Sequence, residues 1–251
     1  MSNNSANNPG VGSGIGSGAG LGGDPSGDPS GTLLVAIDGA AGSGKSSVAR
    51  ESAKRLGFGI LDTGAAYRAL TLSLLQAGAD LDSEEAALNA LQQLDLQLGM
   101  TEDDRVLLSG VDVSERIRTA DIAQNVSHVA KHPRVRKQLN SWFKQTVAAS
   151  GLPGVIIEGR DITTVVAPDA PVRILMTARE EVRIARRAKQ LPELTYAQVA
   201  ADLRARDAKD LRVVDFLNPA PGVTVIDTSE LDFEGSVAAV IATITQTQQE
   251  R

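Results

Sequence analysis

The stretch that most constrains this chain covers residues 39–46, which read Gly-Ala-Ala-Gly-Ser-Gly-Lys-Ser and match the pattern G-x-x-x-x-G-K-[S/T]. An apolar run at residues 33–37 precedes it and is typical of a buried strand. Small and apolar residues then recur at helical spacing from Val48 to Leu56, and Gly57 follows as a cap. A strand, a glycine-rich loop and a helix in this order predict a phosphate-binding loop, whereas a chance glycine-rich turn would not need these neighbours.

The residue types in this loop suit the chemistry of nucleotide phosphates. Glycines let several backbone N–H groups converge on one anion, and the positive end of the following helix points at the same anion. Lys45 can reach the β- and γ-phosphates as a point charge, and the hydroxyl of Ser46 can bind Mg²⁺. The sequence therefore predicts a nucleotide site with Mg²⁺ as its cofactor.

Composition limits what else the chain can do. Its 251 residues include no cysteine, which excludes disulfides and thiolate metal sites. The net charge of −6 and the aromatic content of 3% disfavour a nucleic-acid surface. No apolar run is long enough to cross a bilayer, and we expect a cytoplasmic monomer with no membrane partner. Residues 1–31 are rich in Asn, Ser and Gly, lack the pattern of a signal peptide and are predicted to be disordered.

Strand-like and helical segments alternate through the rest of the chain. This alternation predicts an α/β fold in which helices cover both faces of a parallel sheet. Ligands of such sheets bind at the carboxyl ends of the strands, where Asp38, Asp62, Glu158 and Asp227 are expected. Short strand-like runs within residues 79–115 indicate a small inserted β-rich subdomain. Asp82 is predicted to cap the helix that starts there, and Thr195 a later one.

Three polar clusters follow predicted strand ends or lie on helices beside them. They occupy residues 62–68, 127–136 and 158–166, and each contains arginine. Because arginine binds phosphate through two parallel hydrogen bonds, converging clusters would form a site for a second phosphorylated substrate.

These motifs, in this order, resemble bacterial cytidylate kinase. The similarity rests on the phosphate loop, Asp-Thr-Gly-Ala-Ala-Tyr-Arg at 62–68, Pro-Arg-Val-Arg at 133–136 and Gly-Arg-Asp at 159–161, and it covers residues 32–247. It implies the phosphate-loop nucleoside monophosphate kinase fold: a parallel five-stranded sheet flanked by helices, a nucleoside monophosphate-binding insertion at about 63–127 and a short lid at about 179–205. The implied reaction moves the γ-phosphoryl group of ATP to CMP or dCMP with Mg²⁺, by in-line transfer.

The resemblance also implies roles for individual residues. The ATP phosphates would be held by Gly39, Ala40, Ala41, Gly42, Ser43, Gly44, Lys45, Ser46 and Ser47, with Ser46 on the metal. CMP would be held by Thr63, Arg68, Ser127, Arg136, Arg160, Asp161, Arg206 and Asp210. Catalysis would depend on Lys45, Arg160 and Arg186, where Arg186 belongs to a lid that also carries Arg183 and Arg187. Independently of any family, a carboxylate such as Asp161 can accept a hydrogen bond from the N4 amine of cytosine, which uracil lacks.

Some residues depart from the family pattern or admit two interpretations. The usual late phosphate-binding arginine is either Arg212, displaced by one residue, or absent. Glu158 could hold a Mg²⁺-bound water or accept backbone N–H groups that shape the following turn, and His128 and His132 are interpreted as structural. The alternative function is a phosphate-loop kinase of another small acceptor. A guanine-binding switch would need an Asn-Lys-x-Asp motif, which the chain does not contain.

Overall fold

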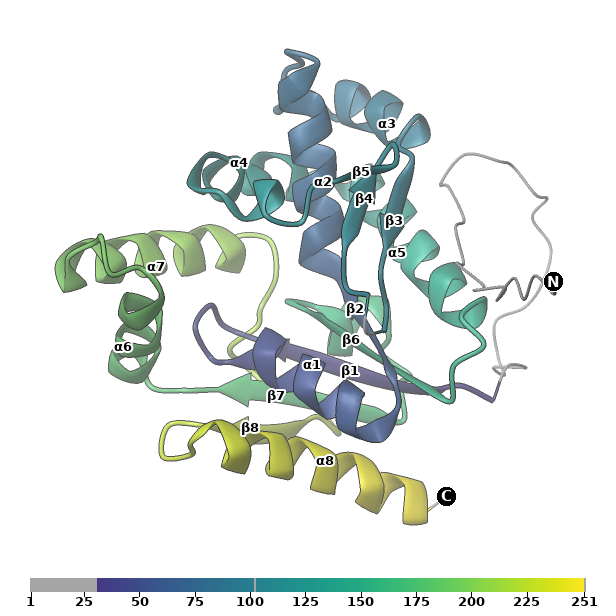
Figure 1. Ribbon diagram of the computed structural model, residues 1–251, viewed down its shortest axis with the longest axis vertical. Helices are drawn as coiled ribbons and strands as arrows, with labels where there is room; N and C mark the ends of the chain where they lie inside the picture. The colour runs from purple at the N-terminus through teal and green to yellow at the C-terminus, as the bar shows by residue number, and fades with distance from the viewer. Residues whose placement is uncertain (1–30, 102, 251) are drawn as a thin grey trace, which may run out of the picture.

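The computed structural model describes residues 31–101 and 103–250 (Figure 1). Residues 1–31 were predicted to be disordered, and residues 1–30 lie outside the described part of the chain.

The centre of the molecule is a five-stranded parallel sheet, as predicted. Its strands are β1 (Leu33–Gly39), β2 (Gly59–Asp62), β6 (Gly154–Gly159), β7 (Val172–Thr177) and β8 (Thr224–Asp227), in the order β2-β6-β1-β7-β8. All neighbouring pairs are parallel, and the register sets Asp62 beside Glu158 and Asp38 beside Gly159. The carboxyl ends of β1, β2 and β6 therefore meet at one edge.

Helices cover both faces of this sheet (Figure 1). On one face α1 (Lys45–Leu56) and α8 (Phe233–Gln249) pack against alternate side chains of β1, such as Val35 and Ile37. On the other face α2 (Thr63–Gln76), α4 (Ala120–Ala130) and α5 (Pro133–Ala148) enclose a second core that includes Ala36. The near-continuous apolar run of β1 follows from burial on both sides.

A separate antiparallel sheet lies beside α2 in Figure 1. It consists of β3 (Leu96–Leu98), β4 (Val106–Leu108) and β5 (Val111–Asp112), with α3 (Glu84–Gln92) before it and a short 3-10 turn, η1 (Arg116–Arg118), after it. The small β-rich unit is thus present, although the limits of a nucleotide-binding insertion stay a prediction. The predicted cap was wrong: Ser83, one residue later, accepts from the N–H of Ala86, and Asp82 instead pairs with His128 and Lys131.

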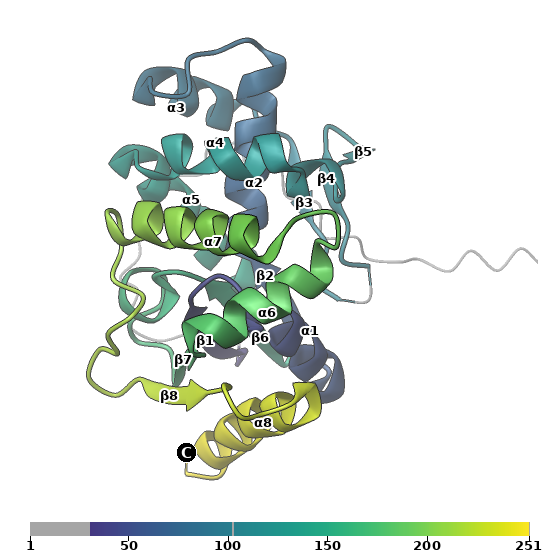
Figure 2. The same ribbon diagram turned by 90° about the vertical axis from the view of Figure 1, so that its left-hand side faces the viewer.

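Helices α6 (Glu180–Gln190) and α7 (Tyr196–Leu211) form a pair over the carboxyl edge of the main sheet (Figure 2). Thr195 caps α7 as predicted, in a capping box with Gln198. A small apolar cluster that includes Ile184 and Leu203 joins the two helices and packs against Ala41 of the glycine-rich loop. The helix pair therefore packs directly against the loop. Whether residues 179–205 act as a lid stays a prediction.

Candidate active site

The glycine-rich loop curls tightly between β1 and α1. A Cβ atom added to Gly39 would lie 2.4 Å from the carbonyl oxygen of Met176, so no side chain fits there. Gly42 has a φ of +78°, and a Cβ there would lie 3.0 Å from the carbonyl oxygen of Arg183. Backbone curvature and close packing against β7 and α6 therefore both require glycine.

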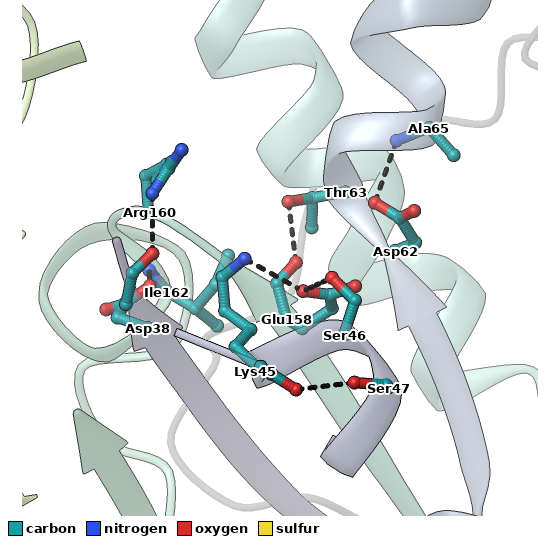
Figure 3. Close-up of polar contacts among 12 residues, drawn as sticks. Asp38, Lys45, Ser46, Ser47, Asp62, Thr63, Ala65, Glu158, Arg160 and Ile162 are labelled. Carbon is teal, nitrogen blue, oxygen red and sulfur yellow. Dashed lines mark hydrogen bonds and ion pairs between the residues drawn. The ribbon is translucent and has the colours of Figure 1, made fainter. Parts of the chain in front are cut away.

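The loop ends in a helix whose first N–H groups donate to no capping side chain, because Gly44 is the N-cap residue. These groups and the helix dipole form an anion-binding end. Lys45 lies in the first turn, with its Nζ atom 3.2 Å from Oε2 of Glu158, and the hydroxyl of Ser46 donates to the same oxygen at 2.8 Å (Figure 3). Glu158 therefore pairs with the two loop side chains that sequence analysis assigned to phosphate and metal.

Asp38, not Glu158, shapes the turn that follows β6. The Asp38 carboxylate accepts from the N–H groups of Ile162 and Thr163 at 2.7 and 2.8 Å and from the Thr163 hydroxyl at 2.7 Å. Burial raises the pKa of Asp38, although these hydrogen bonds oppose the rise. Within the described part of the chain, the Glu158 carboxylate forms an ion pair with Lys45 and accepts a hydrogen bond from Ser46, and it accepts from no backbone N–H group. The alternative interpretation, in which Glu158 accepts N–H groups that shape the following turn, was therefore wrong.

Two arginines are fixed near this edge by carboxylates. Asp62 ends β2, accepts from the N–H of Ala65 at 2.9 Å and pairs with Arg68 at 2.9 Å. Burial of Asp62 opposes its ionisation, yet the charges of Arg68 and Lys45 leave its pKa below the ordinary value. Arg160 follows β6, pairs with Asp210 of α7 at 2.8 Å and donates to the carbonyl of Gly39 at 2.6 Å. Arg160 thereby connects the glycine-rich loop to the helix pair.

Arg206 completes a group of arginines at the same place. The residue keeps an exposed surface, yet desolvation by the surrounding protein, followed by repulsion from Arg160, lowers its pKa to about 10. The Asp210 carboxylate opposes this fall, and Arg68 and Arg187 add smaller contributions to it. Arg160, Arg68 and Arg187 thus lie close enough to Arg206 to act on its charge, while Arg206 forms no ion pair with any residue that the structure describes. Arginine side chains gathered in this way are of the chemical type that binds phosphate. The hydroxyl of Thr63 is beside them and donates to the carbonyl of Glu158 at 2.9 Å.

A third group faces a groove between α5 and α7. Arg136 forms an ion pair with Asp161, and both side chains are mostly buried. Burial raises the pKa of Asp161, the charge of Arg136 opposes this rise, and the nearby Asp38 adds to it. Ser127 and Arg136 line a groove of about 920 Å³. Arg136 therefore shares this groove with Ser127 and pairs with Asp161, while the joint role of the three in reading a base stays a prediction.

The groove is positively charged in a protein of net charge −6. No carboxylate is among its lining residues, and its cationic side chains are Lys131, Arg136, Lys137, Lys144, Lys209 and Arg212. Arg212 thus faces the same groove as Ser127 and Arg136, and its role as a displaced phosphate-binding arginine stays a prediction.

The arginines of α6 contact the glycine-rich loop in different ways. Arg183 is buried, pairs with Asp207 of α7 at 2.5 Å and donates to the carbonyl of Ala41 at 3.0 Å. Arg186 donates to the carbonyls of Ser43, Thr228 and Leu231, which ties the loop to the segment after β8. Its contact with a transferring phosphoryl group stays a prediction.

The donor set fits Mg²⁺ delivered with a nucleotide. Among the described residues, no group of three or more His, Cys, Asp or Glu side chains is placed to hold a metal. Mg²⁺ ordinarily takes one or two protein ligands and several phosphate or water oxygens. The Ser46 hydroxyl and the Glu158 carboxylate, 2.8 Å apart, are of the chemical type that could supply such ligands directly or through water.

Sequence reasoning missed several residues of this region. Thr163 falls within the polar cluster at 158–166 but was given no role there, yet its hydroxyl donates to the Asp38 carboxylate. Asp207, the partner of Arg183, directly follows the predicted site residue Arg206. Helical spacing could have suggested Asp207 only if the contact between α6 and α7 were known. Phe216, whose ring faces the guanidinium group of Arg160, lies outside any periodic pattern, so no local signal in the sequence indicated it.

Comparison with known proteins agrees with this geometry. The family model described as cytidylate kinase matches residues 35–247. A curated cytidylate kinase of Cutibacterium acnes is 42% identical over 212 residues, which is 83% of this chain and 94% of the relative. One from Mycobacterium leprae is 44% identical over 204 residues, covering 79% of this chain and 89% of the relative. No helix in the described part of the chain is long and apolar enough to span a membrane.

The family match and these relatives show that the chain belongs to the cytidylate kinase family, whose members are phosphotransferases.

Proposed function

We propose that this enzyme transfers the γ-phosphoryl group of ATP to CMP or dCMP, forming CDP or dCDP, with Mg²⁺ bound to the donor. The observation that supports this most is the position of Arg160, which contacts the carbonyl of Gly39 in the donor loop while belonging to the arginine group expected to hold the acceptor phosphate. One guanidinium group thus connects the two proposed nucleotide sites.

The proposed mechanism is alignment combined with charge neutralisation. The loop N–H groups and Lys45 hold the β- and γ-phosphates, and Arg68, Arg160 and Arg206 hold the acceptor phosphate in line with them. Because the acceptor oxygen is already ionised, no strong general base is needed. When bound, Mg²⁺ would neutralise charge on the phosphate oxygens, and Ser46 is its protein ligand in this proposal.

The acceptor base would be selected by Asp161 and Arg136. The carboxylate of Asp161 accepts from the N4 amine of cytosine, whereas uracil presents a carbonyl oxygen there and would leave the partly buried carboxylate facing an acceptor. Ser127 lines the same groove and adds a hydroxyl. Asp210 would contact the ribose from α7.

A coupled assay of ADP release with CMP, dCMP, UMP and AMP as acceptors tests the proposal. We expect CMP and dCMP to be phosphorylated at least tenfold more efficiently than UMP or AMP. Preference for a non-cytidine acceptor would favour the alternative, a phosphate-loop kinase of another small molecule. Lys45→Ala is the matched negative control, since it removes the charge on the donor side only.

A further inference from the structure

One buried aromatic ring in the loop after α7 faces the guanidinium group of Arg160. The Cζ atom of Arg160 lies 4.8 Å from the ring centre of Phe216, which is only 2% exposed. This distance is within the range of a cation–π contact, and such contacts strengthen when water is excluded.

Phe216 completes a three-sided enclosure around Arg160. The Gly39 carbonyl accepts from one terminal nitrogen of the guanidinium group and the Asp210 carboxylate from the other, at 2.6 and 2.8 Å. The ring contacts the face of the group and uses none of its five N–H donors. It therefore orients the arginine without neutralising its charge, which a further carboxylate would do.

The loop fixes the ring through a local turn. The Asp215 carboxylate accepts from the N–H groups of Leu217 and Asn218 at 3.0 and 3.1 Å and from the side-chain amide of Asn218 at 2.8 Å. These bonds restrain the backbone on both sides of Phe216. The position of the ring is thus set by the turn as well as by burial.

We propose that Phe216 is a positioning residue that acts through Arg160, holding the guanidinium group between the donor loop and the acceptor phosphate. This inference rests on the proposed function of Arg160. An arriving phosphate competes with Asp210 for the Arg160 donors, whereas the ring contact can persist because it does not occupy them. Phe216 thus keeps Arg160 oriented when its ion pair with α7 is shared with the substrate.

A double-mutant cycle tests this role. Phe216→Leu keeps an apolar side chain but removes the π face, so kcat/KM for CMP should fall by about 2- to 30-fold while KM for ATP is unchanged. Phe216→Trp should retain most activity. In an Arg160→Ala background, adding Phe216→Leu should cause no further loss. Phe58→Leu, which changes a buried ring in the core between the sheet and helices α1 and α8, is the control for general destabilisation.

Two results would overturn the inference. The first is an unchanged kcat/KM for CMP in Phe216→Leu, and the second is an equal loss with and without Arg160, which would indicate a purely structural ring. If Arg160→Ala itself retains full CMP turnover, the proposed acceptor site fails together with this inference. If Arg160→Ala is impaired and Phe216→Leu is normal, only the inference fails.

Discussion

Replacing Asp161 by Asn probes base selection with little change of shape. In the free enzyme the Asp161 side chain is 11% exposed and pairs with Arg136, which is 17% exposed. The amide of Asn can still accept from the N4 amine of cytosine, but as a neutral group, and its NH₂ can donate to the O4 atom of uracil. The substitution should therefore weaken CMP and improve UMP relative to the native enzyme.

The size of the effect follows from the charge on the acceptor. Hydrogen bonds to charged groups contribute about 1.5–3 kcal/mol, and each 1.4 kcal/mol is a factor of ten. Loss of the charge should lower kcat/KM for CMP by about 10- to 150-fold. Because Arg136 also loses its ionic partner, we expect the upper part of this range, together with a measurable loss of folding stability.

The assay compares kcat/KM for CMP and UMP in native and Asp161→Asn enzyme, with KM for ATP as an internal control. Arg134→Gln, which changes an exposed arginine on the helix that carries Arg136, serves as a matched surface control. An unchanged ratio of CMP to UMP efficiency would refute the assignment of Asp161 to the base, as would an equal loss in ATP binding.

Three further outcomes are expected. Thr163→Val should lower the free energy of unfolding by about 1.5–3 kcal/mol in denaturant titrations, because the buried Asp38 carboxylate loses a hydroxyl donor, while Thr163→Ser should be near native; equal stability of both variants would contradict this. The charge-reversing pair Lys137→Glu and Lys144→Glu should reduce kcat/KM for CMP at low salt and flatten its dependence on ionic strength, since the basic groove attracts the dianionic acceptor; a salt dependence equal to native would contradict steering. The charged partners Lys131 and His128 lower the pKa of Asp82 from 3.8 to about 2. Its contribution to stability is therefore full above pH 3.8 and lost as the pH falls through about 2, so Asp82→Asn should unfold with a shallower pH dependence there, and an unchanged slope would argue against the pair.

Much of the donor half of the site could be predicted from sequence because its information is local. Residues 39–46 are contiguous, their glycines satisfy steric needs of the same few residues, and the flanking strand and helix follow from short-range periodicity. The alternation of strands and helices likewise predicted the parallel sheet, since a parallel connection requires a crossover. For the acceptor half, sequence spacing showed only that arginines follow strand ends, and their individual roles came from the family resemblance.

Only the tertiary structure decided the partners of the later arginines. Asp62 and Arg68 lie close together in one motif, but nothing local in the sequence indicates that Asp210 holds Arg160 from a helix fifty residues away or that Asp161 holds Arg136. The cap assigned to Asp82 failed for the same reason, because long-range ion pairs with α4 and its C-cap compete with a local hydrogen bond that Ser83 can supply. Sequence patterns encode contacts within one element, whereas the charge balance of this site depends on the packing of α7 against the carboxyl edge of the sheet.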